Sequence, residues 1–172
     1  MPATTFDRLP DDARLWVFAA ARDLAPQESA ALLGHVDGFL ERWAAHGAPV
    51  VGARELRHGR FLLVGADERA TGVSGCSIDS LFHTLAGVEA ELGAGLRDTA
   101  SLVFYRDDVG AVHAAPRAEF RRLAQGGEVG EDTPVFDNTV RTVGELRAGR
   151  WETRFGDAWH ARAFPLGAAA KA

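Results

Sequence analysis

Residues 49–66, PVVGARELRHGRFLLVGA, decide the fold, because they contain two extended runs on either side of a glycine turn. The runs PVVGARELR (49–57) and RFLLVGA (60–66) are separated by His58 and Gly59. Short extended runs that flank a Gly-containing turn predict a β-hairpin. A hairpin here interrupts the strand–helix alternation of a doubly wound parallel sheet, so that fold class is the less favoured interpretation.

A strand and a helix are predicted before the hairpin. The apolar run RLWVFAAAR at 14–22 is typical of a buried strand. Pro26 suits the first turn of a helix, and Gly47, after His46, suits its termination. Apolar residues recur between these two points at spacings of three and four, which predicts an amphipathic helix; they are Leu32, Leu33, Val36, Phe39, Leu40 and Trp43.

A second helix and a further strand are predicted after the hairpin. The apolar stripe of this helix consists of Ile78, Leu81, Phe82, Leu85, Val88 and Leu92. Gly93 and Gly95 are expected to end it. The run SLVFYR at 101–106 predicts the next strand.

The resulting order, β-α-β-β-α-β, predicts an α+β fold with a ferredoxin-like core over residues 13–106. In this fold two amphipathic helices would cover one face of a four-stranded antiparallel sheet. Residues 107–165 are expected to form a C-terminal α/β extension packed on the core. The extension would contain strands at 111–116 and 133–138, a helix at 117–127, and a helix at 138–149 capped by Asp137 or Asn138.

Composition excludes several classes of protein and site. The formal net charge of −5 argues against general nucleic-acid binding, which normally needs a basic excess. A single cysteine excludes an intramolecular disulfide framework and any zinc site with two thiolates. No apolar run reaches the roughly 18 residues of a membrane span, and the first residues lack a signal-peptide pattern. We therefore expect a cytoplasmic protein with no membrane partner, no metal site and no cofactor.

Four short motifs carry a resemblance to a known family. HGAPV at 46–50, SGCSID at 74–79, DTPVF at 132–136 and DAWH at 157–160 resemble a family of small bacterial proteins often labelled "ABC transporter ATPase". The resemblance covers nearly the whole chain and implies a shared fold. The chain lacks the G-x-x-x-x-G-K-[ST] loop that cradles phosphates, so the sequence does not support the ATPase label.

A second resemblance lies in the extension. The segment APRAEFRRLAQGGEVGEDTPVF at 115–136 is similar to the helix-and-strand part of GYF-type modules, although the GYF tripeptide is absent. Such modules bind proline-rich peptides through aromatic pockets. This resemblance implies a peptide partner.

The loop that holds the cysteine, TGVSGCSIDSLFHTL at 71–85, is the first candidate site. A Gly/Ser loop that runs into a helix exposes unpaired backbone N–H groups, which bind anions and favour a thiolate. Ligand binding would involve Ser74, Gly75, Cys76, Ser77 and Asp79, and Cys76 is the candidate catalytic residue. The alternative is a structural role. Ser77 or Cys76 would then cap the helix, and the Asp79 carboxylate in its first turn would interact favourably with the helix dipole.

A catalytic cysteine needs a base within hydrogen-bonding distance. His83 lies seven residues after Cys76, about 10 Å along a helix axis, which is too far for a direct pair. Any base would have to come from elsewhere, and His46, His58 and His160 are the candidates. We therefore rank a thiol-dependent enzyme or redox protein below a non-enzymatic binding module.

The second candidate site is the aromatic and basic segment WETRFGDAWHARAF at 151–164. Trp151, Trp159 and His160 are its candidate interaction residues, because aromatic residues with arginine are enriched in interfaces. The same side chains would alternatively form a structural clasp over the sheet. The binding-module hypothesis thus has a peptide or protein partner, or a small anionic ligand, as its occupant.

Overall fold

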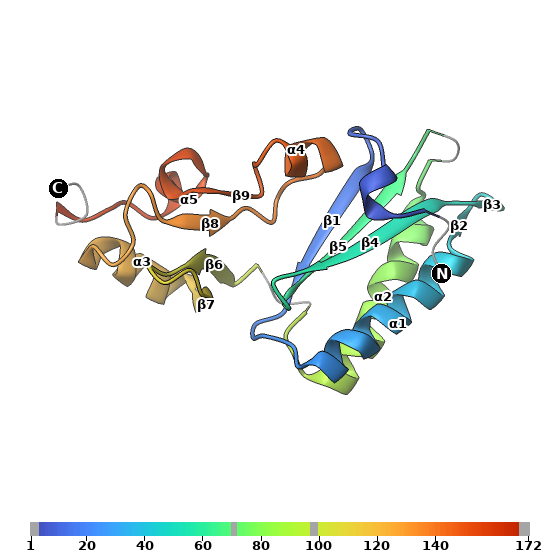
Figure 1. Cartoon of the computed structure of the whole chain (residues 1–172), viewed down its shortest axis with the longest axis horizontal. Helices are drawn as coiled ribbons and strands as arrows, with labels where there is room; N and C mark the ends of the chain where they lie inside the picture. The colour runs from blue at the N-terminus through green and yellow to red at the C-terminus, as the bar shows by residue number, and fades with distance from the viewer. Residues whose placement is uncertain (1–3, 70–71, 97–99, 169–172) are drawn as a thin grey trace.

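The computed structural model describes residues 4–69, 72–96 and 100–168. Its strands form two larger antiparallel sheets, and helices pack on both of them (Figure 1). The first half contains η1 (Phe6–Arg8), β1 (Arg14–Ala19), α1 (Pro26–Arg42), β2 (Ala44–Ala45), β3 (Ala48–Pro49), β4 (Val51–Arg57), β5 (Phe61–Asp67) and α2 (Gly75–Leu92). The second half contains β6 (Leu102–Arg106), β7 (Val112–Pro116), α3 (Arg117–Gly126), β8 (Pro134–Phe136), α4 (Val143–Arg147), β9 (Glu152–Arg154), η2 (Phe155–Asp157) and α5 (His160–Ala163).

The predicted hairpin is confirmed as β4 and β5, and β1 joins it in an antiparallel sheet of order β1-β5-β4. Helices α1 and α2 lie side by side on one face of this first sheet (Figure 1). Most residues of the two predicted helical stripes belong to the cluster between the helices and the sheet, whereas Ile78 and Phe82 lie outside it and Phe82 is exposed. The periodicity therefore identified the correct buried faces.

Strand β5 lies at the centre of the first sheet and is buried on both faces. Leu62 and Val64 pack against the two helices. Phe61 and Leu63 point to the opposite face, where they pack against the C-terminal half of the chain. Burial on both sides explains why residues 61–66 form a continuous apolar run instead of an alternating one.

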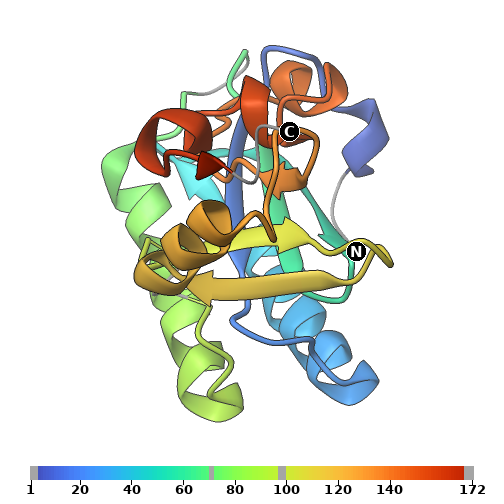
Figure 2. The same ribbon diagram turned by 90° about the vertical axis from the view of Figure 1, so that its left-hand side faces the viewer.

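Residues 102–106 do form a strand, β6, but they do not join the first sheet, so the predicted four-stranded ferredoxin-like sheet is not confirmed. Both edges of β6 are used in a second antiparallel sheet of order β7-β6-β8-β9. Figure 2 shows β6 and β7 running across the strands of the first sheet instead of along them. Strand pairing was decided by the neighbours β7 and β8, which follow later in the chain.

Three predicted boundaries differ from the structure. Helix α1 ends at Arg42, and His46 and Gly47 have φ values of 52° and 79° in the turn of the small β2–β3 hairpin. The helix predicted at 138–149 is only the short α4, and its cap is Thr142 instead of Asp137 or Asn138. Short elements such as these span too few residues to produce a helical periodicity.

The second sheet is covered by α3 and α5. Helix α3 ends at Gly126 and is capped by Gly127, which has a left-handed φ of 84°, in agreement with the predicted termination by glycine. Phe120, Phe155 and Phe164 are buried here with Val103 and Val135 of the sheet. A separate cluster, with Phe104, Phe136 and Trp151 among its members, fills the space between the two sheets.

Candidate functional site

The cysteine loop begins helix α2, and the cap is a residue that neither structural alternative named. The Ser74 hydroxyl accepts a hydrogen bond from the Ser77 backbone N–H at 3.2 Å. The buried Ser77 hydroxyl in turn donates to the Ser74 carbonyl at 2.8 Å. Ser74 is therefore the N-cap of α2, and Ser77 closes the first turn.

Cys76 is exposed in the first turn of α2. The Nδ1 atom of His83 lies 2.7 Å from the Asp79 carbonyl, one turn back on its own helix. Among the described residues, no histidine or carboxylate makes a hydrogen bond to the Cys76 thiol. The loop thus brings Ser74, Gly75, Cys76, Ser77 and Asp79 together at a helix start without placing a base beside the thiol.

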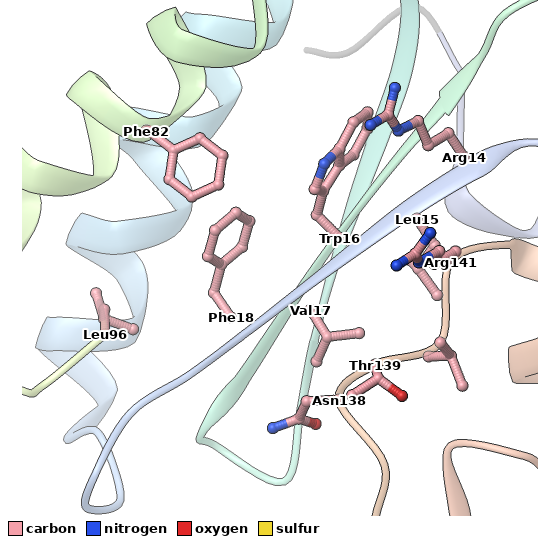
Figure 3. A pocket seen from close by; sticks show the side chains of 11 residues that line it. Arg14, Leu15, Trp16, Val17, Phe18, Phe82, Leu96, Asn138, Thr139 and Arg141 are labelled. Atoms are coloured by element: carbon pink, nitrogen blue, oxygen red, sulfur yellow. The ribbon is translucent and has the colours of Figure 1, made fainter. Parts of the chain in front are cut away.

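A groove of about 720 Å³ lies along the outer edge of β1, and Cys76 does not line it (Figure 3). Phe18 and Phe82 point toward each other on one side of it, and Asn138 and Thr139 lie on the other side. We call this the β1 groove; its lining residues are Arg14, Leu15, Trp16, Val17, Phe18, Phe82, Leu96, Asn138, Thr139, Val140 and Arg141.

A second hollow, of about 420 Å³, lies between the second sheet and the C-terminal segment. We call it the aromatic pocket; its lining residues are Ala100, Leu102, Val103, Phe104, Arg117, Phe136, Asn138, Thr139, Trp159 and His160. Asn138 and Thr139 border both hollows, so the turn after β8 separates the groove from the pocket. Both volumes fall within the range of ordinary ligand sites, roughly 300–1,000 Å³.

His160 is the unusual polar group in the wall of the aromatic pocket. Its side chain is 1% exposed, and its Nδ1 atom is buried without a hydrogen-bond partner. Burial lowers the pKa of His160 from 6.5 to about 4, with the Asp137 carboxylate opposing the shift and the Arg117 guanidinium adding to it. The imidazole is therefore neutral near pH 7, and one of its polar atoms is left without a partner in an apolar setting.

Arg117 supplies a positive charge at the same pocket. It is the exposed first residue of α3, and its guanidinium lies 5.3 Å from the centre of the Trp159 ring and 5.1 Å from that of Phe164. Within the described part of the chain, no carboxylate forms an ion pair with Arg117. A guanidinium held over aromatic rings and left without a counter-ion is suited to recognise a carboxylate or phosphate.

Of the three interaction residues predicted in the tail, two lie together and the third lies elsewhere. Trp159 and His160 are brought together as a stacked pair with ring centres 4.0 Å apart, and both line the aromatic pocket. Trp151 is buried between the two sheets, where its Nε1 donates to Asn138 Oδ1 at 3.0 Å. Trp151 thus lies in the interior of the molecule, whereas Trp159 and His160 border a pocket.

Several lining residues had no signal in the sequence. Phe104 and Phe136 come from separate strands, and Asn138 and Thr139 come from a turn, so only the tertiary structure places them beside Trp159. Arg117 lies at the start of the short helix α3, and nothing local in the sequence connects it to His160.

Comparisons with models of protein families, with curated proteins and with solved structures found no match to this chain. The two resemblances described above therefore stay predictions. Within residues 4–69, 72–96 and 100–168, no group of three or more His, Cys, Asp or Glu side chains is placed to hold a metal ion. No helix in those ranges has the length and apolar content needed to cross a membrane.

Proposed function

We propose that the protein is a non-enzymatic binding module, and that its aromatic pocket holds a small anionic ligand with a flat, apolar body. The observation that carries this proposal is the Arg117 guanidinium, which borders the pocket beside Trp159 and forms no ion pair with a described carboxylate.

The pocket lining accounts for the proposed chemistry of the ligand. Phe104 and Phe136 provide apolar walls, and Trp159 adds an aromatic side chain to the lining. The Arg117 guanidinium can donate two parallel hydrogen bonds to a carboxylate, a geometry that a lysine ammonium would not match. A small aromatic carboxylate combines these features, with its ring between the aromatic side chains and its acid group toward Arg117.

A thiol-dependent activity at Cys76 remains the alternative. Its support is the exposure of the thiol at the start of α2. The geometry favours binding instead, because the aromatic pocket combines a cation with aromatic and apolar walls, whereas the loop offers backbone groups and a thiol alone. We further propose a cytoplasmic location, in agreement with the single cysteine.

Titration with phenylacetate, followed by tryptophan fluorescence and by NMR, tests this proposal. We expect saturable binding with a Kd below about 1 mM. Arg117→Gln should weaken binding about tenfold or more, because a hydrogen bond to a charged group contributes about 1.5–3 kcal/mol.

Arg121→Gln is the matched control for this experiment. Arg121 is exposed on the same helix and also lies over Phe164, at 5.6 Å, but it does not line the pocket. Its replacement should leave the Kd of phenylacetate unchanged. The pocket would be rejected as the binding site if both substitutions raised the Kd of phenylacetate equally. It would also be rejected if neither substitution changed that Kd.

A further inference from the structure

The outer edge of β1 offers free backbone hydrogen-bonding groups over a short length. Leu15 donates its N–H to the Arg141 carbonyl at 2.8 Å, so the odd-numbered residues of β1 direct their backbone groups away from β5. The Ala21 N–H donates to the Ala94 carbonyl at 2.8 Å on the same side. Between these two bonds lies Val17, whose N–H and C=O face the β1 groove and have no bond to any other residue that the structure describes.

This edge is free because the predicted fourth strand pairs elsewhere. Residues 102–106 lie in the second sheet, and among the described residues only the bridge between Arg14 and Thr142 continues the first sheet beyond β1. An unpaired strand edge of this kind is a template for an incoming strand.

Apolar side chains surround one end of the groove. Phe82 on α2 is 44% exposed, which is unusual for a phenylalanine, and it meets Phe18 edge-to-face with ring centres 5.5 Å apart (Figure 3). Leu96 lies at the same end. An apolar side chain placed here would cover Phe82 and bury it.

The opposite end is positively charged. Arg14 and Arg141 line it, and among the residues that the structure describes no acidic side chain lines the groove. Arg14 has Glu68 at 3.6 Å, whereas Arg141 is exposed and forms no ion pair with any described carboxylate. The backbone of residues 141–143 runs antiparallel to β1 at this end and blocks the path of a longer added strand.

We propose that the β1 groove binds the carboxyl-terminal residues of an extended partner chain, which add to the first sheet as a strand antiparallel to β1. In this direction the partner runs from Phe18 toward Leu15, so its terminal carboxylate arrives beside Arg141. Its last residue lies opposite Trp16, the preceding residue pairs with Val17, and an apolar side chain two residues before the end packs on Phe18 and Phe82. This site is separate from the aromatic pocket and goes beyond the proposed function.

A fluorescein-labelled heptapeptide tests the proposal, with valine as its last residue, phenylalanine two residues earlier, and serine or threonine elsewhere. We expect saturable binding in fluorescence anisotropy. Amidation of the terminal carboxylate should weaken binding about tenfold, because it removes the charge-assisted bond to Arg141. No saturable binding at about 1 mM peptide would overturn the proposal.

Two N-methylated peptides test the strand geometry without any change to the protein. N-methylation of the penultimate residue removes the N–H that would pair with Val17 and should weaken binding at least about tenfold. N-methylation of the phenylalanine removes an N–H that points away from β1 and should have little effect. Equal losses with both peptides, or none with either, would overturn strand addition.

Two protein variants test the charged end. Arg141→Gln should lower the affinity for the free acid to that for the amide, and it should leave the amide's affinity unchanged. Arg150→Gln, at an exposed residue outside the groove, should change neither. Arg117→Gln should also leave peptide binding unchanged, which separates failure here from failure at the aromatic pocket.

Dimerisation of the peptide-free protein is the remaining outcome. If analytical ultracentrifugation shows a dimer that the heptapeptide does not dissociate, the edge of β1 pairs with a second copy of the chain. That result would overturn the proposal, whereas a monomer that binds the free acid supports it.

Discussion

The two sheets of the protein are held together by different kinds of side chain. The first sheet and its two helices enclose a cluster rich in leucine and valine around β5. The second sheet has short strands, and phenylalanine, tryptophan and arginine side chains hold it together. Phe18 and Leu96 of this cluster border the β1 groove, whereas Phe104, Phe136 and Trp159 of the second half line the aromatic pocket.

A cluster between the sheets joins these two regions. His58, at the turn of the β4–β5 hairpin, stacks on Trp151 with ring centres 5.9 Å apart. Its imidazole also lies 3.4 Å from the Glu152 carboxylate, which is paired with Arg106 of β6. The hairpin that decides the fold of the first half therefore also anchors the second half.

The largest effect is expected from breaking this junction with Trp151→Ala. Trp151 is 2% exposed and packs against Phe61 and Phe136, with ring centres 5.1 Å away in each case. Loss of the indole should lower the free energy of unfolding by about 3–5 kcal/mol, measured by urea denaturation. Trp159→Ala, at a partly exposed residue, is the comparison and should cost clearly less. The reverse order would mean that Trp159, not Trp151, is the clasp.

A smaller effect, dependent on pH, is expected from His160 in the second region. Its pKa is about 4 in the folded protein, against 6.5 ordinarily, so the unfolded chain binds more protons between these values. The stabilisation by the neutral imidazole is complete above about pH 6.5 and is lost as the pH falls toward 4. By pH 5 the loss should reach about 2 kcal/mol.

His160→Phe keeps an aromatic ring beside Phe120 and Phe164 but removes the titration. Urea denaturation at pH 7.5 and pH 5 should show a decrease in the wild type that is about 2 kcal/mol larger than in the variant. The other titrating groups are common to both proteins and cancel in this difference. Equal decreases in both proteins would mean that His160 has an ordinary pKa.

The helix caps provide a third and finer test of whether the two regions unfold together. Ser74 caps α2 in the first region, and Thr142, which accepts from the Glu145 N–H at 3.1 Å, caps α4 in the second. Replacement of either residue by alanine should cost about 1 kcal/mol. If the junction makes the protein one cooperative unit, both variants should shift a single transition, seen equally by circular dichroism and tryptophan fluorescence. Two separate transitions would contradict that coupling.

The contrast between the regions also explains what the sequence could predict. In the first half, long helices with aliphatic stripes and a doubly buried strand produce clear periodic patterns, so the order of the main helices and strands to 106 was predicted, while the short η1, β2 and β3 were missed. The sheet to which β6 belongs was not predicted, because pairing depends on β7 and β8 and leaves no mark within residues 102–106.

For the candidate sites, the sequence identified residue types and missed most of their neighbours. Trp159 and His160 stood out because aromatic and basic residues are concentrated near them, and they do line one pocket. No sequence pattern predicted the β1 groove. The edge of β1 is open because β6 pairs in the second sheet instead of beside β1. Its residues come from β1, α2, Leu96 and the turn after β8.

The smallest effect is expected from Cys76→Ser. Because Cys76 is exposed at the start of α2 and Ser74 provides the cap, the substitution should change the free energy of unfolding by no more than about 0.5 kcal/mol. Iodoacetamide should label the thiol in the native protein as readily as in urea. Phenylacetate binding should be unchanged in the variant, because Cys76 does not line the aromatic pocket. Loss of that binding would instead connect the cysteine loop to the pocket and restore Cys76 as a functional residue.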